Sequence, residues 1–171
     1  MKRSFIRRIF NRLLHLLARF SPGSTNLRPF LHRLRGVKIY GKVFIGDDVY
    51  LENEHPECVE IHDGAGIGLR STIIAHSGGI GEHGRIVIEK NAAIMSCCTI
   101  VCSAGQNLTI GEGSVLSAGS VVSNDVPPRT LCAGPRIRAL ATVTVPYTLD
   151  ASHDDFVRGL RPIRASDKEE R

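Results

Sequence analysis

The histidines are the side chains of this sequence best suited to proton transfer, and one of them occupies an unusual place. His76 lies in STIIAHSGGIGEHGR, residues 71–85, where an otherwise regular pattern of aliphatic residues is lost. Because the unperturbed pKa of an imidazole is about 6.5, a histidine can take up and return a proton near neutral pH. His76 is therefore the first candidate for a general base, and His83, in the same stretch, is the second.

Five cysteines add thiols but no recognisable metal or disulfide spacing. Cys97 and Cys98 are adjacent, and Cys102 follows without a second cluster. An odd number of cysteines without a CxxC pair predicts reduced thiols in a cytoplasmic protein, present as small, partly buried side chains.

The pattern around His76 has a period of six residues and extends over about 37–127. Branched aliphatic residues recur in four trios, with steps of six inside a trio and of ten, fifteen and ten between trios. The trios are Ile39, Ile45, Leu51; Ile61, Ile67, Ile73; Ile88, Ile94, Ile100; and Ile110, Leu116, Val122. A period of six fits neither a helix, at about 3.6, nor a simple strand, at about 2. It predicts a solenoid of stacked parallel strands, three to a coil, with the aliphatic side chains inside.

The residues between the aliphatic positions fit the corners of such a three-walled column. The residue that stands four positions after each aliphatic residue is in most cases small. Glycine often follows the aliphatic residue directly, as in IGDDV, IGLRS and IGEGS. The break at 74–87 is then an insertion at one corner of the column.

Charge divides the chain into a basic arm and a mildly acidic body. The formal net charge is +5, but residues 1–35 contain nine Lys or Arg and no acidic residue, whereas the remaining 136 contain thirteen basic and seventeen acidic residues. This asymmetry suggests that the arm meets an anionic partner, and it argues against a body that binds nucleic acid.

The arm, residues 1–36, contains an amphipathic helix in MKRSFIRRIFNRLLHLLARF. Its apolar side carries Ile6, Ile9, Phe10, Leu13, Leu17 and Phe20, and its polar side carries Arg7, Arg8, Arg12, His15 and Arg19. Two interpretations stay open. The apolar side packs on the body or on a neighbouring subunit, or residues 1–20 lie in the surface of an anionic membrane.

The composition, with 42% hydrophobic and 23% charged residues, is typical of a folded soluble protein. No apolar run approaches the roughly 18 residues of a membrane span, and the N-terminus lacks the cleavage site of a secretory signal. We expect a cytoplasmic protein, with the inner face of the membrane as a peripheral location. Residues 141–171 are expected to form a short strand and a loose tail without chemistry of their own.

The repeat resembles that of the hexapeptide-repeat acyltransferases, and the match extends from residue 37 to about 140. The stretch IGEGSVLSAGSVVSNDVPPRTLCAGPRIR is similar to the final coil of the galactoside and maltose type of sugar O-acetyltransferase. The resemblance implies a mainly β protein, a left-handed parallel β-helix of about four coils with an N-terminal amphipathic α-helix. It also implies a homotrimer, acetyl-CoA as the acyl donor, a hydroxyl of a sugar or cell-envelope polysaccharide as the acceptor, and no metal.

In that family the general base is a histidine late in a coil, before an extended loop that faces a groove between subunits. His76 meets this description, and residues 77–87 would form the wall of the substrate pocket. His76 follows Ile73 by three residues, whereas relatives usually have a gap of about five and a following proline. Because of this departure, His83 stays an alternative base. His83 and Asn53, which lies on the first coil, are also candidates for substrate binding.

The resemblance also implies contacts with acetyl-CoA. Ser96 matches a position near the thiol end of pantetheine, and Ala118 matches one whose backbone lines the groove. Asn124 stands where many relatives have Lys or Arg, and the chain is one residue short before Pro135. The complete set of expected contacts is Ser96, Ala118, Ser123, Asn124, Arg136 and Arg138. The two arginines would pair with phosphates, for which a guanidinium is well shaped.

Two alternatives to acyl transfer remain at this stage. The gamma-type carbonic anhydrases use a similar β-helix with three zinc-binding histidines, two of them about five residues apart. Here His76 and His83 are seven apart, and His62 lies in another hexapeptide. The second alternative is a non-catalytic β-helix scaffold that is anchored by the basic helix.

Overall fold

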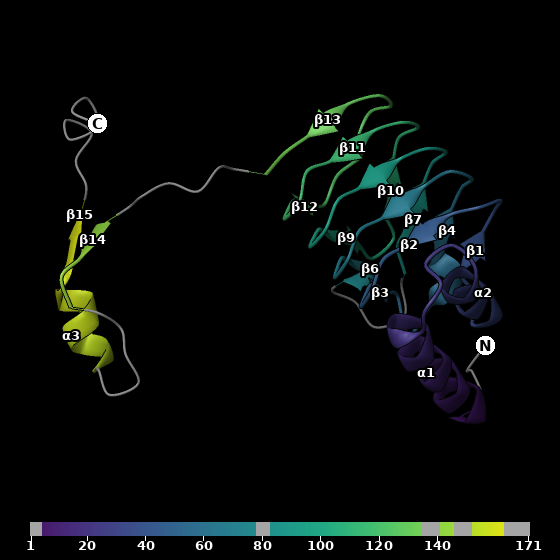
Figure 1. The fold of residues 1–171 in the computed structure, drawn as a ribbon, viewed down its shortest axis with the longest axis horizontal. Coiled ribbons are helices and arrows are strands. Elements are labelled where there is room, and N and C mark those ends of the chain that lie inside the picture. The colour runs from purple at the N-terminus through teal and green to yellow at the C-terminus, as the bar shows by residue number, and fades with distance from the viewer. Residues whose placement is uncertain (1–4, 78–82, 135–140, 146–151, 163–171) are drawn as a thin grey trace. The chain divides into compact units, whose positions relative to one another are not determined.

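The computed structural model describes residues 5–77, 83–134, 141–145 and 152–162 (Figure 1). Contacts divide the chain into two units, Met1–Gly134 and Pro135–Arg171. In the second unit β14 (Ala141–Val143) pairs antiparallel with β15 (Leu160–Pro162), and the short helix α3 spans His153–Arg158. The first unit contains the hexapeptide repeat and two N-terminal helices.

The repeat folds into a column of three parallel sheets, which Figure 1 shows as stacked coils. The first sheet contains β1 (Lys38–Ile39), β4 (Val59–Ile61), β7 (Arg85–Ile88) and β10 (Asn107–Ile110). The second contains β2 (Phe44–Ile45), β5 (Gly66–Ile67), β8 (Ala93–Ile94), β11 (Val115–Leu116) and β13 (Leu131–Cys132). The third contains β3 (Tyr50–Leu51), β6 (Thr72–Ser77), β9 (Thr99–Ser103) and β12 (Val121–Val122).

The register of the sheets confirms the predicted stacking of aliphatic residues. Each pairs with its equivalent in the next coil, giving the ladders Ile39–Ile61–Ile88–Ile110, Ile45–Ile67–Ile94–Leu116 and Leu51–Ile73–Ile100–Val122. Eleven of the twelve side chains are buried, and Val122, in the last coil, packs partly buried against them. Since each such burial contributes about 1.5–3 kcal/mol, these ladders form the core of the column.

The glycine that follows several aliphatic residues has a steric cause. A Cβ at Gly46 would lie 2.5 Å from the backbone nitrogen of Leu69, and a Cβ at Gly68 would lie 2.5 Å from the backbone nitrogen of Ser96. The next coil approaches too closely for any side chain at these positions. Close packing between coils therefore explains why glycine follows isoleucine at these positions.

Two corners of the column are tight turns, and the third is open to loops. The tight corners each use a residue with positive φ: Gly41, Gly64, Asn91 and Gly113 at the first corner, and Asp48, Arg70, Cys97 and Gly119 at the second. At the third corner, between the third and first sheets, the extra residues of each coil leave the column. The predicted interruption at 74–87 was too wide, because β6 continues to Ser77 and β7 begins at Arg85.

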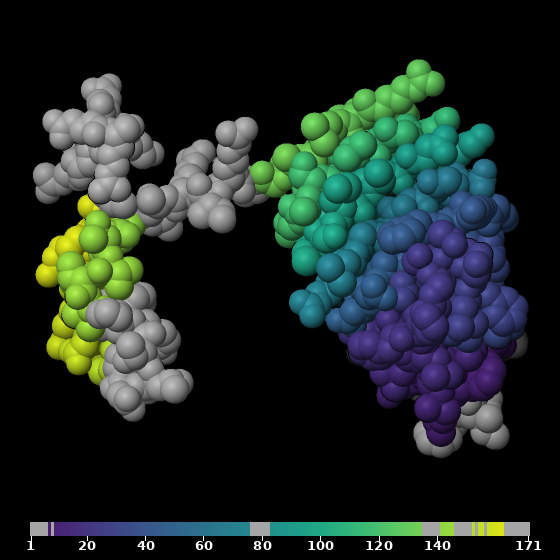
Figure 2. Space-filling model, in the orientation of Figure 1, coloured from purple at the N-terminus to yellow at the C-terminus, as the bar shows by residue number. Residues whose placement is uncertain are grey.

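The N-terminal helices α1 (Phe5–Phe20) and α2 (Leu27–Leu34) contact each other and the first coil (Figure 2). Packing of the apolar side on the body was one of our two interpretations, and within this chain it is wrong. Asn11, His15 and Arg19 on α1 and Arg28 on α2 contact polar groups of the body, and Leu14 and Ala18 on the same side of α1 are buried. The opposite sides form an outward apolar face made of Ile9, Phe10, Leu13, Leu16, Leu17, Phe20, Leu27, Phe30 and Leu34.

Three arginines cap the edge of the first coil, where no further coil supplies hydrogen bonds. Arg33 donates through Nε to the carbonyl of Ile39 at 3.1 Å. Arg28 and Arg35 donate to the carbonyls of Ile45 and Leu51. These three carbonyls occupy the same position in each of the three walls. An unpaired sheet edge is a site for aggregation, so part of the basic arm serves to close the column.

Among the described residues no helix has both the length and the apolar character needed to cross a membrane.

Candidate active site

The open third corner of the column is where most of the predicted chemical residues meet. The segments that follow strands of the third sheet lie here: residues 52–58, 104–106 and 123–125, and the described end of the insertion, residues 83–84. Asn53, His76, His83, Ser123 and Asn124 all belong to these segments or border them. The fold thus gathers residues that are about 70 positions apart in the chain along one edge.

His76 lies in β6, and its side chain is outside the described part of the structure. The backbone beside it is fixed from two directions. The N–H of Ala75 donates to Oε2 of Glu52 at 2.8 Å, and the carbonyl of Ala75 accepts from the N–H of Gly84 at 2.7 Å. Both bonds are made by Ala75, directly before His76, and the bond with Gly84 closes the base of the insertion.

Gly84 must be a glycine at this place, because a Cβ would lie 2.6 Å from the Sγ of Cys102 in the next coil. Gly84 therefore brings the returning chain of the insertion into close contact with the third coil. Buried Cys102 in turn contacts the carbonyl of Gln106 through its Sγ, at 3.2 Å.

Glu52 is a functional candidate that the sequence analysis missed. Its side chain is fully buried, and its carboxylate accepts three backbone hydrogen bonds, from Ala75, from Glu54 at 2.9 Å and from His55 at 3.0 Å. Buried carboxylates are rare unless they are hydrogen-bonded in this way. One feature of the sequence could have pointed to Glu52: it is an acidic residue directly after the inward-facing Leu51, at a position where the other coils have apolar or small residues.

His83 stacks on His55 from the first coil. The two ring centroids are 3.3 Å apart with an angle of 24° between the ring planes, and the His83 side chain is exposed. Nδ1 of His55 lies 3.6 Å from Oε1 of Glu57. The stack thus joins the returning end of the insertion to the loop of the preceding coil.

Asn53 and His62 are held in other contacts. The side-chain oxygen of Asn53 lies 3.0 Å from Nδ1 of His15, so Asn53 holds α1 on the column. His62 follows the first sheet, at a different corner from His83, with Nε2 3.0 Å from Oε1 of Glu60. Within the described ranges no three His, Cys, Asp or Glu side chains come together as a group that could hold a metal ion. Cys97, Cys98, Cys102 and Cys132 are present as thiols outside any disulfide.

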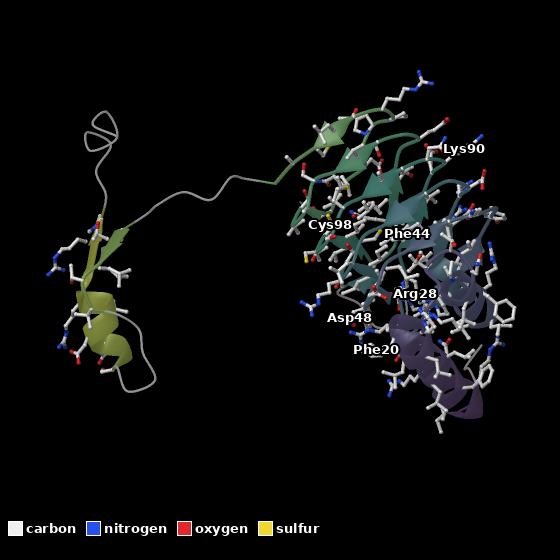
Figure 3. All side chains as sticks on the ribbon, in the orientation of Figure 1. Phe20, Arg28, Phe44, Asp48, Lys90 and Cys98 are labelled. Atoms are coloured by element: carbon white, nitrogen blue, oxygen red, sulfur yellow. The ribbon has the colours of Figure 1, made fainter. Side chains whose placement is uncertain are left out.

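The residues expected to contact acetyl-CoA fall at two corners. Ser96 and Ala118 lie at the second corner on adjacent coils, where the N–H of Gly119 donates to the carbonyl of Ser96 at 3.0 Å. Ser96 also lines a mainly apolar groove of about 270 Å³, together with Phe44, Gly66, Ala93 and Met95. Figure 3 labels Phe44 on the column.

Ser123 and Asn124 are exposed at the third corner, and Arg136 and Arg138 lie outside the described residues. The third sheet separates these two corners. Within one chain the predicted donor contacts are therefore divided: Ser123 and Asn124 share the corner of His76, whereas Ser96 and Ala118 lie at the second corner.

A three-walled column of hexapeptide repeats with an insertion at one corner defines a class of parallel β-helix proteins. No family model matches the chain. YvoF of Bacillus subtilis (strain 168), whose name assigns it provisionally to the acetyltransferases, is 28% identical over 144 residues, which cover 81% of this chain and 79% of YvoF. A Staphylococcus aureus (strain COL) protein with a similar provisional name, SACOL2570, is 35% identical over 51 residues, 30% of this chain and 26% of its own.

A solved structure extends this similarity. The hexapeptide-repeat acetyltransferase VCA0836 of Vibrio cholerae, complexed with acetyl-CoA, superposes with a TM-score of 0.55 and 25% identity over 75% of this chain and 82% of that one. Both the sequence and the fold therefore support the resemblance to the hexapeptide-repeat acyltransferases. The predicted fold class, a mainly β, left-handed parallel β-helix with an N-terminal helix, is confirmed. The galactoside and maltose subtype stays a prediction.

Proposed function

We propose that this protein transfers the acetyl group of acetyl-CoA to a hydroxyl of a sugar or of a cell-envelope polysaccharide, with His76 as the general base. The observation that carries the proposal is the open corner, where β6 ends one residue after His76 and where hydrogen bonds to Glu52 and Gly84 hold Ala75 in place. Support for the donor comes from VCA0836, which was solved with acetyl-CoA.

The reaction requires a general base and a groove that binds the acyl donor. An imidazole nitrogen takes the proton of the acceptor hydroxyl as its oxygen attacks the thioester carbonyl. The tetrahedral intermediate then collapses, the carbon–sulfur bond breaks, and the CoA thiolate receives the proton from the imidazolium. The products are an acetyl ester and CoA, and the base returns to its neutral form.

The separation of the two corners supports a trimer as the active form. Ser96 and Ala118 lie on one side of the third sheet, and the corner of His76 lies on the other. A neighbouring copy would bring its open corner to the second corner of the first chain, so that each site contains residues of two chains. We expect a homotrimer on this basis.

The donor residues fit a long, polyanionic cofactor. The groove at Ser96 is mainly apolar and shallow, as the pantetheine arm requires. Ala118 is exposed beside it and small enough to leave the path open. Arg136 and Arg138 follow the last coil and would pair with the nucleotide phosphates.

The test is an assay of CoA release against a panel of simple sugars and cell-envelope glycans, with wild type and three single variants. His76→Ala should lower kcat on the order of 10²- to 10⁴-fold and leave the affinity for CoA within about threefold of wild type. His62→Ala, at another corner, is the matched control and should keep kcat.

The outcomes separate the alternatives. If His83→Ala loses kcat and His76→Ala keeps it, the base is His83. If the folded wild type fails to bind CoA at millimolar concentration, the acetyl-transfer proposal is wrong and a scaffold role replaces it.

A further inference from the structure

The N-terminal helices are docked in the reverse of the usual orientation. An amphipathic helix on a soluble protein normally buries its apolar stripe and exposes its polar side. Here the nine side chains of the outward apolar face are 43–69% exposed, although Ala18 on the opposite side of α1 is fully buried. These exposed side chains belong to two helices at one end of the column (Figure 1), and apolar surface exposed in this way usually marks an interaction site.

Specific polar contacts hold this orientation. Asn11 donates through Nδ2 to the carbonyl of Asn53 at 2.7 Å, and Nε of Arg19 donates to Asp48 at 2.9 Å. Arg28 is buried between the helices and the first coil, where it donates to Ile45 (Figure 3). Rotation of the helices to bury their apolar side would break these bonds. The exposure of the apolar face is therefore a built feature.

The charge around the face selects the chemistry of its partner. The first acidic residue of the chain is Asp47, and it pairs with Arg28. Three exposed cations of α1 and the first coil are Arg7, Lys38 and Lys42. The side chain of Arg12, which flanks Leu16 on α1, is 66% exposed although it contacts Glu54.

We propose that the outward apolar face binds the surface of an anionic phospholipid membrane. The apolar side chains would enter the boundary between headgroups and acyl chains, and the arginines and lysines around them would face the lipid phosphates. The surface lies at the end of the column, away from the strands of the later coils. This inference goes beyond acetyl transfer, and its test requires neither acetyl-CoA nor an acceptor.

The experiment uses the full chain and two kinds of vesicle, phosphatidylcholine alone and phosphatidylcholine with about 30% phosphatidylglycerol. Wild type should sediment with the anionic vesicles and much less with the neutral ones. A double variant, Leu13→Glu with Leu17→Glu, should weaken the binding about tenfold or more. The matched control, Val121→Glu with Leu131→Glu, changes two exposed apolar residues of the late coils and should bind like wild type.

A second measurement reports insertion directly. The chain contains no tryptophan, so Phe10→Trp places a single fluorophore on the face. Its emission should shift to the blue when anionic vesicles are added. Phe44→Trp, at a similarly exposed phenylalanine of the second sheet, is the control and should not shift.

Two results would overturn the proposal. One is a wild type that stays in the supernatant with anionic vesicles while Phe10→Trp shows no shift. The other is a fall in oligomer mass for the Leu13 and Leu17 double variant, measured by sedimentation equilibrium without lipid. That fall would assign the face to a second copy of the chain.

Discussion

The carboxylate of Glu52 in the first coil accepts a hydrogen bond from the backbone N–H of Ala75 in the second, at 2.8 Å. The bond joins the loop after β3 to the residue that precedes His76. Since the same carboxylate also binds the N–H groups of Glu54 and His55, a single buried side chain fixes two loops of the open corner. We regard Glu52 as a positioning residue for the segment that carries His76.

Glu52→Ala should lower the free energy of unfolding by about 3 kcal/mol, because it removes the carboxylate that accepts from the buried N–H of Ala75 and from the partly buried N–H groups of Glu54 and His55. Glu52→Gln keeps one amide oxygen and should fold, with kcat lowered about tenfold and the KM for acetyl-CoA nearly unchanged. The control is Glu89→Gln, since Glu89 accepts a comparable bond from Glu112 N–H at 2.8 Å on the exposed surface. Equal effects of the two Gln variants on kcat would refute the positioning role.

Arg28→Met should destabilise the protein by about 2–3 kcal/mol, because the buried carbonyl of Ile45 loses its donor and the first coil loses one of its caps. Arg70→Met is the control. The side chain of Arg70 is 70% exposed and 3.9 Å from Asp48, so its loss should cost less than about 0.5 kcal/mol. Urea unfolding followed by circular dichroism measures both. Similar midpoints for the two variants would argue against capping.

Acid should weaken the attachment of the helices to the column. Burial, and next the positive charge of Arg35, lower the pKa of His15 to about 4, and burial also lowers the pKa of His32 well below its usual value. Between about pH 6.5 and 4 the unfolded chain therefore binds a proton at His15 that the folded chain does not, so stability falls as the pH falls through this range. The loss at pH 4 from His15 is on the order of 3 kcal/mol.

His15→Gln removes this titrating group. Its free energy of unfolding should fall less than that of wild type between pH 6.5 and 4, as measured by chemical denaturation at a series of pH values. A wild-type stability that stays flat over this range would contradict the prediction.

Gly68→Ala should destabilise the second and third coils, because a methyl group would lie 2.5 Å from the backbone nitrogen of Ser96. We expect a loss of about 2–3 kcal/mol and weaker binding of CoA in the groove beside Ser96. Gly66→Ala is the matched control for stability, since nothing lies within 4 Å of a Cβ at that position. Thermal unfolding decides the prediction, and an equal loss in both variants would disprove it.

Much of the column could be predicted from the sequence. The trios of aliphatic residues predicted three walls, and the structure pairs Ile45 with Ile67 and Ile67 with Ile94 as the spacing required. The prediction succeeded because each coil presents the same inward position to its neighbours, so the pattern is repeated at every level of the stack. His76 was selected as a candidate because it stands where this pattern is interrupted, and its role stays a prediction.

The role of Glu52 could not be predicted, because its three partners are backbone N–H groups, two of them in its own loop and one 23 residues away. Every residue except proline has a backbone N–H group, so the sequence does not show which of these groups will bind a given carboxylate. Likewise, only the folded column shows that Ser96 and Asn124 lie at different corners.

By itself the sequence determined the period of the column, the inward residues and the two-sided character of the N-terminal helix. Only the tertiary structure decided which side of that helix faces the body. A periodic pattern shows which side chains share a face, but it does not show whether water, lipid or protein covers that face. Here Asn11, His15 and Arg19 on the polar side of α1 contact polar groups of the first coil, so the polar side turned inward and the apolar side turned out. On and after α2, Arg28, Arg33 and Arg35 supplied the hydrogen-bond donors that the carbonyls at the edge of this coil required.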